Sequence, residues 1–460
     1  MPAAASSFYL PPIDAVPVSA NARLSYVLRH FALAYEAVPE GLIGYFGHQL
    51  PIEVSEAAGD FFQQQQPYPA APNYREWTGQ RVPFFFDAQP ETPLLLLEPG
   101  RAHITADLIS AAFFLLSGWQ EYFSETRDRQ GRFPYAASVQ HHYGFVALPV
   151  VNYYFDVLRT AVEHVTGQRL RPRRWPADAP FAAFISHDID ALYSGWKAPA
   201  KAALKQKNFL RFGKLLWRHV AKPDAWNNLE KVAAATAEFG GASTFFILAE
   251  SQRGNDGVPN ADYRISHALR QRLSVLDKKG CEISIHGSIG TATDTQQLDR
   301  EMQLLRPTFS GLRFHYLRWE PRLTPALIDA TNCFAYDSTL GFAEHFGFRN
   351  SYCHHFYPFN FATGSACEFL EIPLNVMDAT LHHLSYLQLQ AGEILPALQP
   401  MFAEIEKFGG VATMLWHNDH FDPANTLTGP HQFAEIMRYL QQRGAAFLTG
   451  EQILAELCVP

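Results

Sequence analysis

The second half of this 460-residue chain alternates short apolar segments with amphipathic helical segments, and this alternation limits the folds open to it. Ser266 is expected to cap a helix over 268–279, which Gly280 ends. Strands that alternate with helices form parallel sheets or barrels, so the pattern predicts an α/β fold of that kind. We predict seven strands, over residues 181–186, 243–248, 281–286, 312–314, 369–373, 411–416 and 445–448.

A stretch rich in proline and arginine, 171–180, separates this half from the one before it. Proline lacks a backbone donor and disfavours helix, so such a stretch is a natural joint between domains. We therefore predict a smaller, mixed α/β accessory domain over 1–175 and a second domain over 179–460.

Two helices are predicted within 1–175, over 22–35 and 104–123, and Thr105 is the expected N-cap of the second. No cluster of residues in this part has the character of a chemical site. Because function has to be argued from a site, we expect a structural or substrate-framing role for it.

Composition and charge argue against several classes of protein. Hydrophobic residues make up 47% of the chain and charged residues 18%, which is typical of a folded core and not of global disorder. The net charge of −8 argues against a general nucleic-acid-binding protein. The five cysteines form no C-x-x-C pair, so they predict neither a disulfide framework nor a zinc finger and favour a reducing compartment.

The N-terminal sequence shows no basic segment followed by an apolar one. No apolar stretch approaches the ~18 residues that are needed to cross a bilayer. We therefore expect neither a signal peptide nor a transmembrane segment, and a cytoplasmic location.

Polar side chains follow several predicted strands at the point where each strand ends. Four such groups occur, at 187–190, 286–288, 313–316 and 416–419. Because the carboxyl ends of parallel strands point to one rim, we expect the four groups to converge. Asp188 and Asp190 are two residues apart, so their carboxylates share one side of an extended segment. Such a pair suits a metal ligand beside a general base.

Each group by itself has a simpler explanation. An aspartate pair more often forms a cap or a turn, and a lone His286 or His417 is more often a hydrogen-bonded structural side chain. Their joint placement on one rim is what favours a site. The pairs at 354–355 and 382–383 lack ligand spacing, so we predict that these histidines are structural. The sequence contains no G-x-S-x-G, Walker A or G-x-G-x-x-G motif, so it lacks the core residues of serine hydrolases, phosphate-loop ATPases and Rossmann oxidoreductases.

From residue 181 onward the chain resembles the polysaccharide deacetylase family, also described as carbohydrate esterase family 4 or the NodB-homology domain. The resemblance implies a distorted (β/α) barrel with a divalent metal, usually zinc, and short motifs on the barrel's rim. Members hydrolyse N- or O-acetyl groups of sugars. The N-terminal part looks like the companion domain of a bacterial subgroup of these proteins.

The first two motifs of the family are matched with changes. The family's Thr-Phe-Asp-Asp-Gly corresponds here to Ser-His-Asp-Ile-Asp, which implies that Asp188 is the general base. Ile189 stands where the family has a metal ligand, so Asp190 would serve one residue later. The second motif supplies two histidine ligands one helical turn apart. His286 matches the first of them, and Gly290 stands in place of the second.

The later motifs follow in the family's order. The family's Arg-x-Pro-Tyr/Trp is matched by Arg313, which would orient the base, and by Tyr316, whose backbone N–H would help to form an oxyanion hole. His315 replaces the proline and is the candidate for the missing ligand. The last motif, Leu-x-His, supplies His417 as the general acid. Residues 336–338 resemble the motif between these two but lack its tryptophan.

The resemblance implies a metal-dependent hydrolase whose divalent metal, usually zinc, is held by Asp190, His286 and His315. It would remove an N- or O-acetyl or related acyl group, such as a formyl group, from a carbohydrate in surface-glycan metabolism. Without an export signal, a nucleotide- or lipid-linked sugar is the expected form of the substrate. Because the second histidine is lost and Ile189 occupies a ligand position, a degenerate barrel that binds a glycan or a protein partner is the alternative.

A basic segment lies between the first two predicted strands. Residues 191–223 contain eight Lys or Arg and no Asp or Glu. Phe212, Leu216 and Val220 recur at helical spacing, as in helices that lie on anionic membranes. We therefore predict a basic, partly exposed surface near the pocket. Most amphipathic helices pack their apolar stripe on the core, so this helix is expected either to pack on the barrel in that way or to make peripheral membrane contact through 197–222.

Overall fold

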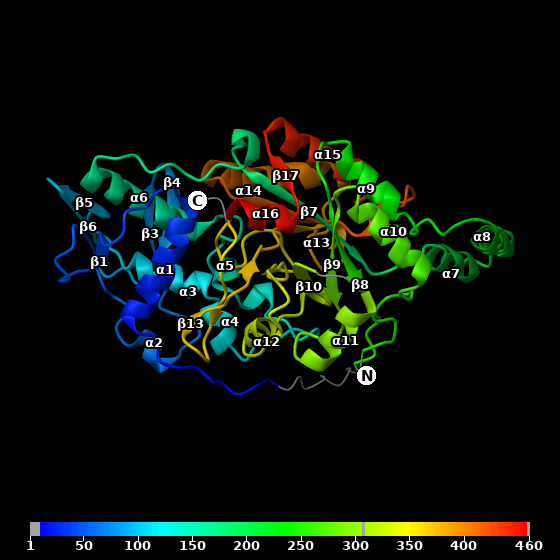
Figure 1. Ribbon diagram of the computed structural model, residues 1–460, viewed down its shortest axis with the longest axis horizontal. Coiled ribbons are helices and arrows are strands. Elements are labelled where there is room, and N and C mark those ends of the chain that lie inside the picture. The colour runs from blue at the N-terminus through cyan, green and yellow to red at the C-terminus, as the bar shows by residue number, and fades with distance from the viewer. Residues whose placement is uncertain (1–9, 255, 306–308, 458–460) are drawn as a thin grey trace.

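The computed structural model describes residues 10–254, 256–305 and 309–457 of the chain. Figure 1 shows two parts side by side, an N-terminal part in blue to cyan and a larger part in green to red. Among the described residues no helix combines the length and the apolar character that a membrane crossing requires.

The N-terminal part is a small sheet covered by helices, as its predicted α/β class requires. Its four-stranded sheet has the order β1-β2-β6-β5, in which only β5 is antiparallel to its neighbour, and β3 and β4 form a separate hairpin. The elements are α1 Ala20–Ala34, β1 Ile43–Tyr45, β2 Ile52–Val54, α2 Phe61–Gln64, β3 Asn73–Trp77, β4 Gln80–Phe84, β5 Leu95–Glu98, β6 Arg101–Ile104, α3 Leu108–Leu116, α4 Trp119–Phe123, α5 Val139–His142 and α6 Val150–Thr166.

The helix predicted over 104–123 is two helices, and its predicted cap is wrong. The first helix, α3, is capped by Asp107, whose Oδ1 accepts from the backbone N–H of Ser110 at 2.9 Å. Thr105 instead donates its hydroxyl to the carbonyl of Pro93 at 3.0 Å. Gly118, at φ +71°, ends the first helix and starts the second. Either Thr105 or Asp107 could cap a helix by residue type, and the backbone path out of β6 decides between them.

The second part is built on one curled sheet in which every pairing is parallel. The order is β14-β11-β10-β9-β8-β7-β16-β15, with β17 also paired to β7. In the described part of the chain no ladder joins β14 to β15, so the sheet is an open half-barrel. This confirms the predicted distorted (β/α) barrel. All seven predicted strands overlap observed ones, whereas β11 and β15 are two residues long and were not predicted.

The elements of the second part alternate between strand and helix along most of its length. They are β7 Ala182–Ile189, α7 Lys197–Lys205, α8 Phe209–Ala221, α9 Leu229–Ala237, β8 Thr244–Leu248, α10 His267–Asp277, β9 Glu282–Gly287, α11 Thr295–Leu305, β10 Gly311–Phe314, α12 Thr324–Thr331, β11 Tyr336–Asp337, β12 Phe359–Asn360, β13 Ser365–Ala366, β14 Leu370–Glu371, β15 Val376–Met377, α13 Asp378–His382, α14 Ile394–Phe408, β16 Val411–Leu415, α15 Pro430–Gln442, β17 Ala446–Leu448 and α16 Gly450–Leu457. The predicted cap of α10 is confirmed, because Ser266 Oγ accepts from the N–H of Leu269.

The strand β7 is an inner strand of this sheet, third from the edge formed by β15. All eight of its residues are buried, as expected for a parallel strand that is covered on both faces. It is flanked by β16 on one side and by β8 and β17 on the other, so its carboxyl end has neighbouring strands on both sides at the rim.

The two parts share one continuous apolar core. Phe155 of α6 packs edge-on against Tyr352, with ring centroids 5.6 Å apart. Arg349 forms a buried bidentate ion pair with Glu121, at 2.8 and 2.5 Å. A buried charge stripped of its partner costs far more than an exposed one, so this pair fixes the geometry of the contact. The division into 1–175 and 179–460 therefore stays a prediction.

Candidate active site

The carboxyl ends of β7, β9, β10 and β16 surround one pocket of about 250 Å³. The parallel register pairs His286 of β9 with Arg313 of β10, so the second and third polar groups lie side by side. The structure brings the proposed site residues together. Those that line the pocket are Asp188, Asp190, His286, His315, Tyr316 and His417.

Three donor atoms in this pocket lie close enough to bind one cation. Nε2 of His286 is 3.0 Å from Nδ1 of His315, and each nitrogen is 3.5 Å from Oδ1 of Asp190. Ligand atoms held by zinc at about 2.0–2.1 Å in a tetrahedron lie roughly 3.3 Å from one another. The spacing of the three donors therefore fits three positions of a tetrahedral site and leaves the fourth free.

The hydrogen bonds of the two histidines orient their lone pairs toward each other. Nδ1 of His286 is 2.9 Å from the carbonyl of Arg313, and Nε2 of His315 is 3.3 Å from the carbonyl of Pro259. A carbonyl only accepts, so both nitrogens donate, and the facing nitrogens carry lone pairs. Burial lowers the pKa of both imidazoles, to about 4 for His315, which disfavours a proton between them. A cation is the species that suits this contact.

Asp190 completes the donor set. Its Oδ1 is buried and has no hydrogen-bond partner among the described residues. Burial raises the pKa of Asp190 to about 6, although His286 and His417 oppose the increase. A buried carboxylate oxygen without a partner is costly, and a bound cation removes that cost. Ile189 lies in the apolar core, so at this strand end it is the Asp190 carboxylate that is available to a cation.

Asp188 is held by a buried arginine. Its Oδ1 accepts from Nη1 of Arg313 at 2.8 Å, and its Oδ2 is 3.5 Å from Nε2 of His286. Burial opposes ionisation of Asp188, but His286 and Arg313 outweigh burial and lower its pKa. Arg313 is itself fixed by Ser186 Oγ and by the carbonyl and hydroxyl of Ser338. The segment 336–338 therefore supports the arginine that positions Asp188.

His417 forms a dyad with a residue that the sequence analysis did not select. Its Nδ1 donates to Oδ1 of Asp378 at 2.8 Å, and its backbone N–H donates to Oδ2 of the same carboxylate. Burial would lower the pKa of His417, but Asp378 outweighs burial and raises it well above its usual value. Nε2 of His417 is left facing the pocket, 3.8 Å from Asp190. Asp378 directly follows β15, a strand of two residues that the sequence did not reveal, so no local pattern marked this carboxylate.

Replacing this carboxylate tests its positioning role. We expect Asp378→Asn to lower kcat by about 10²–10⁴-fold with no loss of bound metal, since an amide no longer stabilises the charged imidazole. A general acid must be protonated, and its activity falls as pH rises through its pKa. The pKa of His417 should fall in the variant, so the alkaline limb of the pH–rate profile should move to lower pH. An unmoved limb with a smaller kcat would mean that Asp378 is merely structural.

Two backbone features shape the rim. Tyr316 and Leu317 both have positive φ, +60° and +54°, a conformation that costs free energy in non-glycine residues and is typical of functional sites. Gly290 has φ +107°, and a Cβ atom there would lie 2.7 Å from Oε1 of Gln297. A histidine at 290 would be strained, so this chain cannot use the family's second ligand position without rearrangement.

The N-terminal part contributes side chains to the pocket. Arg129, Gln130 and Arg132 line it, from the loop between α4 and α5. Arg132 donates to the carbonyl of Tyr316 at 3.1 Å, which ties this loop to the strained turn. These residues were missed because no motif marks them, and only the packing of the two parts brings them to the rim.

The remaining histidines behave mostly as predicted. His354 is buried and bonded to the carbonyl of Phe408, and the buried His355 lies edge-on to Trp175, with ring centroids 6.3 Å apart. His187 is buried between the carbonyl of Trp416 and Ser243. His383 differs, since it lines the pocket.

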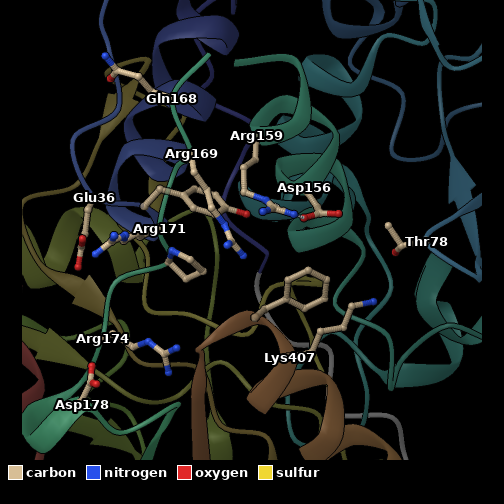
Figure 2. Close-up of a pocket in the computed structure, with 13 residues that line it drawn as sticks. Glu36, Thr78, Asp156, Arg159, Gln168, Arg169, Arg171, Arg174, Asp178 and Lys407 are labelled. Atoms are coloured by element: carbon tan, nitrogen blue, oxygen red, sulfur yellow. Dashed lines mark hydrogen bonds and ion pairs between the residues drawn. The ribbon is translucent and has the colours of Figure 1, made fainter. Parts of the chain in front are cut away.

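A larger cavity lies elsewhere, where α6 and the segment 171–180 meet α14. It has a volume of about 1020 Å³, and Figure 2 shows Arg159, Arg171, Arg174 and Lys407 around it. Arg159 is already paired with Asp156. This cavity contains no set of donors like that of the rim pocket, so its size alone does not make it the reactive site.

Comparisons with known proteins find one family model and several distantly similar structures. A family of unknown function, DUF7033, matches residues 20–167. No curated protein matches the chain. Similar solved structures are a "putative polysaccharide deacetylase" from Mycobacterium smegmatis (16% identity, TM-score 0.40, 62% of this chain and 92% of that one), an allantoinase (13%, 0.40, 62% and 93%) and a probable polysaccharide deacetylase from Pseudomonas aeruginosa PAO1 (14%, 0.39, 62% and 94%). Because likeness this low says nothing of activity, function has to be inferred from the side chains.

Proposed function

We propose that the protein is a metal-dependent hydrolase that removes an acetyl or related acyl group from a carbohydrate. The observation that carries this proposal is the set of three donors, Asp190, His286 and His315, beside a buried carboxylate and a protonated histidine. One aspartate and two neutral histidines are ligands that suit zinc.

Different side chains serve the two proton transfers of the proposed reaction, one from the attacking water and one to the leaving group. A cation held by the three donors would lower the pKa of a bound water and polarise the acyl carbonyl. Asp188, ionised and oriented by Arg313, is the group that takes a proton from the attacking water. His417, charged through Asp378, is the group that gives a proton to the leaving nitrogen or oxygen. The backbone N–H of Tyr316 is the proposed oxyanion donor.

The lining of the pocket favours a substrate with an anionic group. Arg129 is exposed at the pocket and has no ion-pair partner among the described residues, while Arg132 is paired with Asp128. A pocket of about 250 Å³ holds roughly one sugar ring, so the anionic group would lie at its mouth. A sugar carried on a phosphate, either nucleotide- or lipid-linked, fits this arrangement.

The experiment is release of acetate or formate from a panel of acylated sugars, with metal content measured on the same protein. Free N-acetyl sugars, nucleotide-linked sugars and lipid-linked sugars form the panel. We expect about one zinc per chain, activity that a chelator removes and zinc restores, and a preference for phosphate-bearing substrates. Protein that holds no divalent metal and releases no acyl group would instead support a barrel that only binds a glycan or a partner.

A further inference from the structure

The segment between β7 and α9 forms a helical hairpin that projects from the barrel. Its helices α7 and α8 pack against each other, and Figure 1 shows them at the end of the molecule opposite β5 and β6. All eight charged residues within 191–223 are Lys or Arg, in a chain whose net charge is −8. The hairpin is therefore a basic projection on an acidic protein.

The helix α8 buries none of its side chains. Its large apolar residues Phe209, Leu210, Trp217 and Val220 are 70%, 84%, 68% and 80% exposed. A surface helix usually turns its apolar stripe toward the core, so these exposures are unusual. Of the predicted stripe, Leu216 and Val220 are 42% and 80% exposed and Phe212 is half-buried, so α8 does not bury this stripe in the barrel core.

The apolar and basic residues of α8 lie on different faces. With 3.6 residues per turn, Phe209, Trp217 and Val220 share one face. Arg211 and Arg218 lie on the opposite side. In the described part of the chain, the one ion pair that involves α8 comes from its histidine, so its arginines and lysine are free to bind anions. An exposed apolar face flanked by cations is the arrangement of helices that lie in a membrane interface.

The ends of the hairpin are joined to each other and to the barrel, since Nδ2 of Asn418 donates to the carbonyls of Ala191 and Trp226, both at 2.8 Å. Asp224 accepts from the backbone N–H of Gly195 at 3.1 Å, and His219 stacks on Trp196 with ring centroids 4.4 Å apart. The chain enters α7 a few residues after Asp190, at the carboxyl end of β7. The hairpin therefore has a fixed base next to the candidate active site.

We propose that this hairpin docks the protein on anionic phospholipid membranes. The apolar face of α8 enters the interface, and the lysines and arginines of α7 and α8 meet the lipid phosphates. Charge complementarity selects an anionic bilayer, because the eight cations lie in one segment without a compensating carboxylate. The docking does not depend on the proposed hydrolysis. If both hold, the pocket is presented to a lipid-linked substrate.

Vesicle co-sedimentation of the full chain tests the proposal. We expect binding to vesicles of phosphatidylcholine mixed with phosphatidylglycerol, weak or no binding to phosphatidylcholine alone, and a loss of binding as salt rises. The triple variant Arg211→Glu, Lys214→Glu, Arg218→Glu should lower the partition coefficient at least ~100-fold, because each basic residue contributes about fivefold. The double variant Leu210→Ala, Trp217→Ala should weaken the binding that persists at higher salt.

A matched triple variant controls for net charge. Arg81→Glu, Arg101→Glu, Arg169→Glu makes the same charge change at exposed positions of the N-terminal part and should leave binding within about twofold. Equal losses in the two triple variants would show a non-specific charge effect and overturn the proposal. So would no binding to anionic vesicles at low salt, or binding to nucleic acid in its place. Self-association that Trp217→Ala abolishes, without vesicle binding, would assign the face to a second copy of the chain.

Discussion

Asp188→Asn should leave one metal ion per chain and lower kcat by about 10²–10⁴-fold. In the proposed mechanism the substitution removes the group that takes a proton from water, whereas the three proposed ligand atoms belong to other residues. The amide oxygen can still accept from Arg313, so the arginine keeps a partner along with Ser186 and Ser338. Steady-state kinetics on an acyl substrate, with zinc measured on the same samples, provides the test.

The matched control is Asp419→Asn, a carboxylate on the same rim that does not line the pocket. It should keep both metal and activity. Loss of metal from Asp188→Asn with retention in Asp190→Asn would show that the two carboxylates have exchanged roles. Thermal unfolding of each variant distinguishes a local effect on catalysis from a loss of folding stability. The buried hydrogen-bond network around Arg313 is expected to be sensitive to removal of a charge.

Each of Asp190→Ala, His286→Ala and His315→Ala should weaken zinc binding by at least ~100-fold. Three protein ligands are the minimum of a catalytic zinc site, so the loss of any one removes a third of the donors. The decisive variant is His315→Ala, because residue 290 cannot supply the family's second histidine. Competition of each variant with a zinc-binding dye measures the affinity without reference to activity.

His383→Ala is the control for these variants, since His383 lines the pocket outside the donor set. It should bind zinc as tightly as the natural chain. If His315→Ala keeps its zinc and Asp188→Ala loses it, the third ligand is Asp188 and the assignment of His315 is wrong.

The sequence predicted the strands well because the burial of a strand depends on the apolar character of its own consecutive residues. A parallel strand covered on both faces, such as β7 or β16, needs a largely apolar segment, and the segments 182–185 and 411–415 are recognisable without knowledge of the fold. The polar groups that end β7, β9, β10 and β16 could also be recognised in the sequence, because each of them directly follows an apolar strand segment. Their convergence in one pocket follows from parallel pairing, which brings all the carboxyl ends to one rim.

Local signals failed where a contact joins distant segments. Asp378 looked unremarkable until β15 placed it beside β16 and under His417. Thr105 and Asp107 were equivalent as caps until the turn out of β6 selected one of them. In each case residue type allowed several roles, and the path of the backbone chose one.

The sequence by itself determined the α/β class, the strand segments and the carboxylates and histidines of the rim, because these depend on apolar periodicity and on the order of residues along single strands. Only the tertiary structure decided that three donors stand 3.0–3.5 Å apart, that Arg129 and Arg132 reach the pocket from the N-terminal part, and that α8 buries none of its side chains. Distances between segments far apart in the chain, and the exposure of a helix that could have packed, are set by the packing of the whole molecule, which no local pattern encodes.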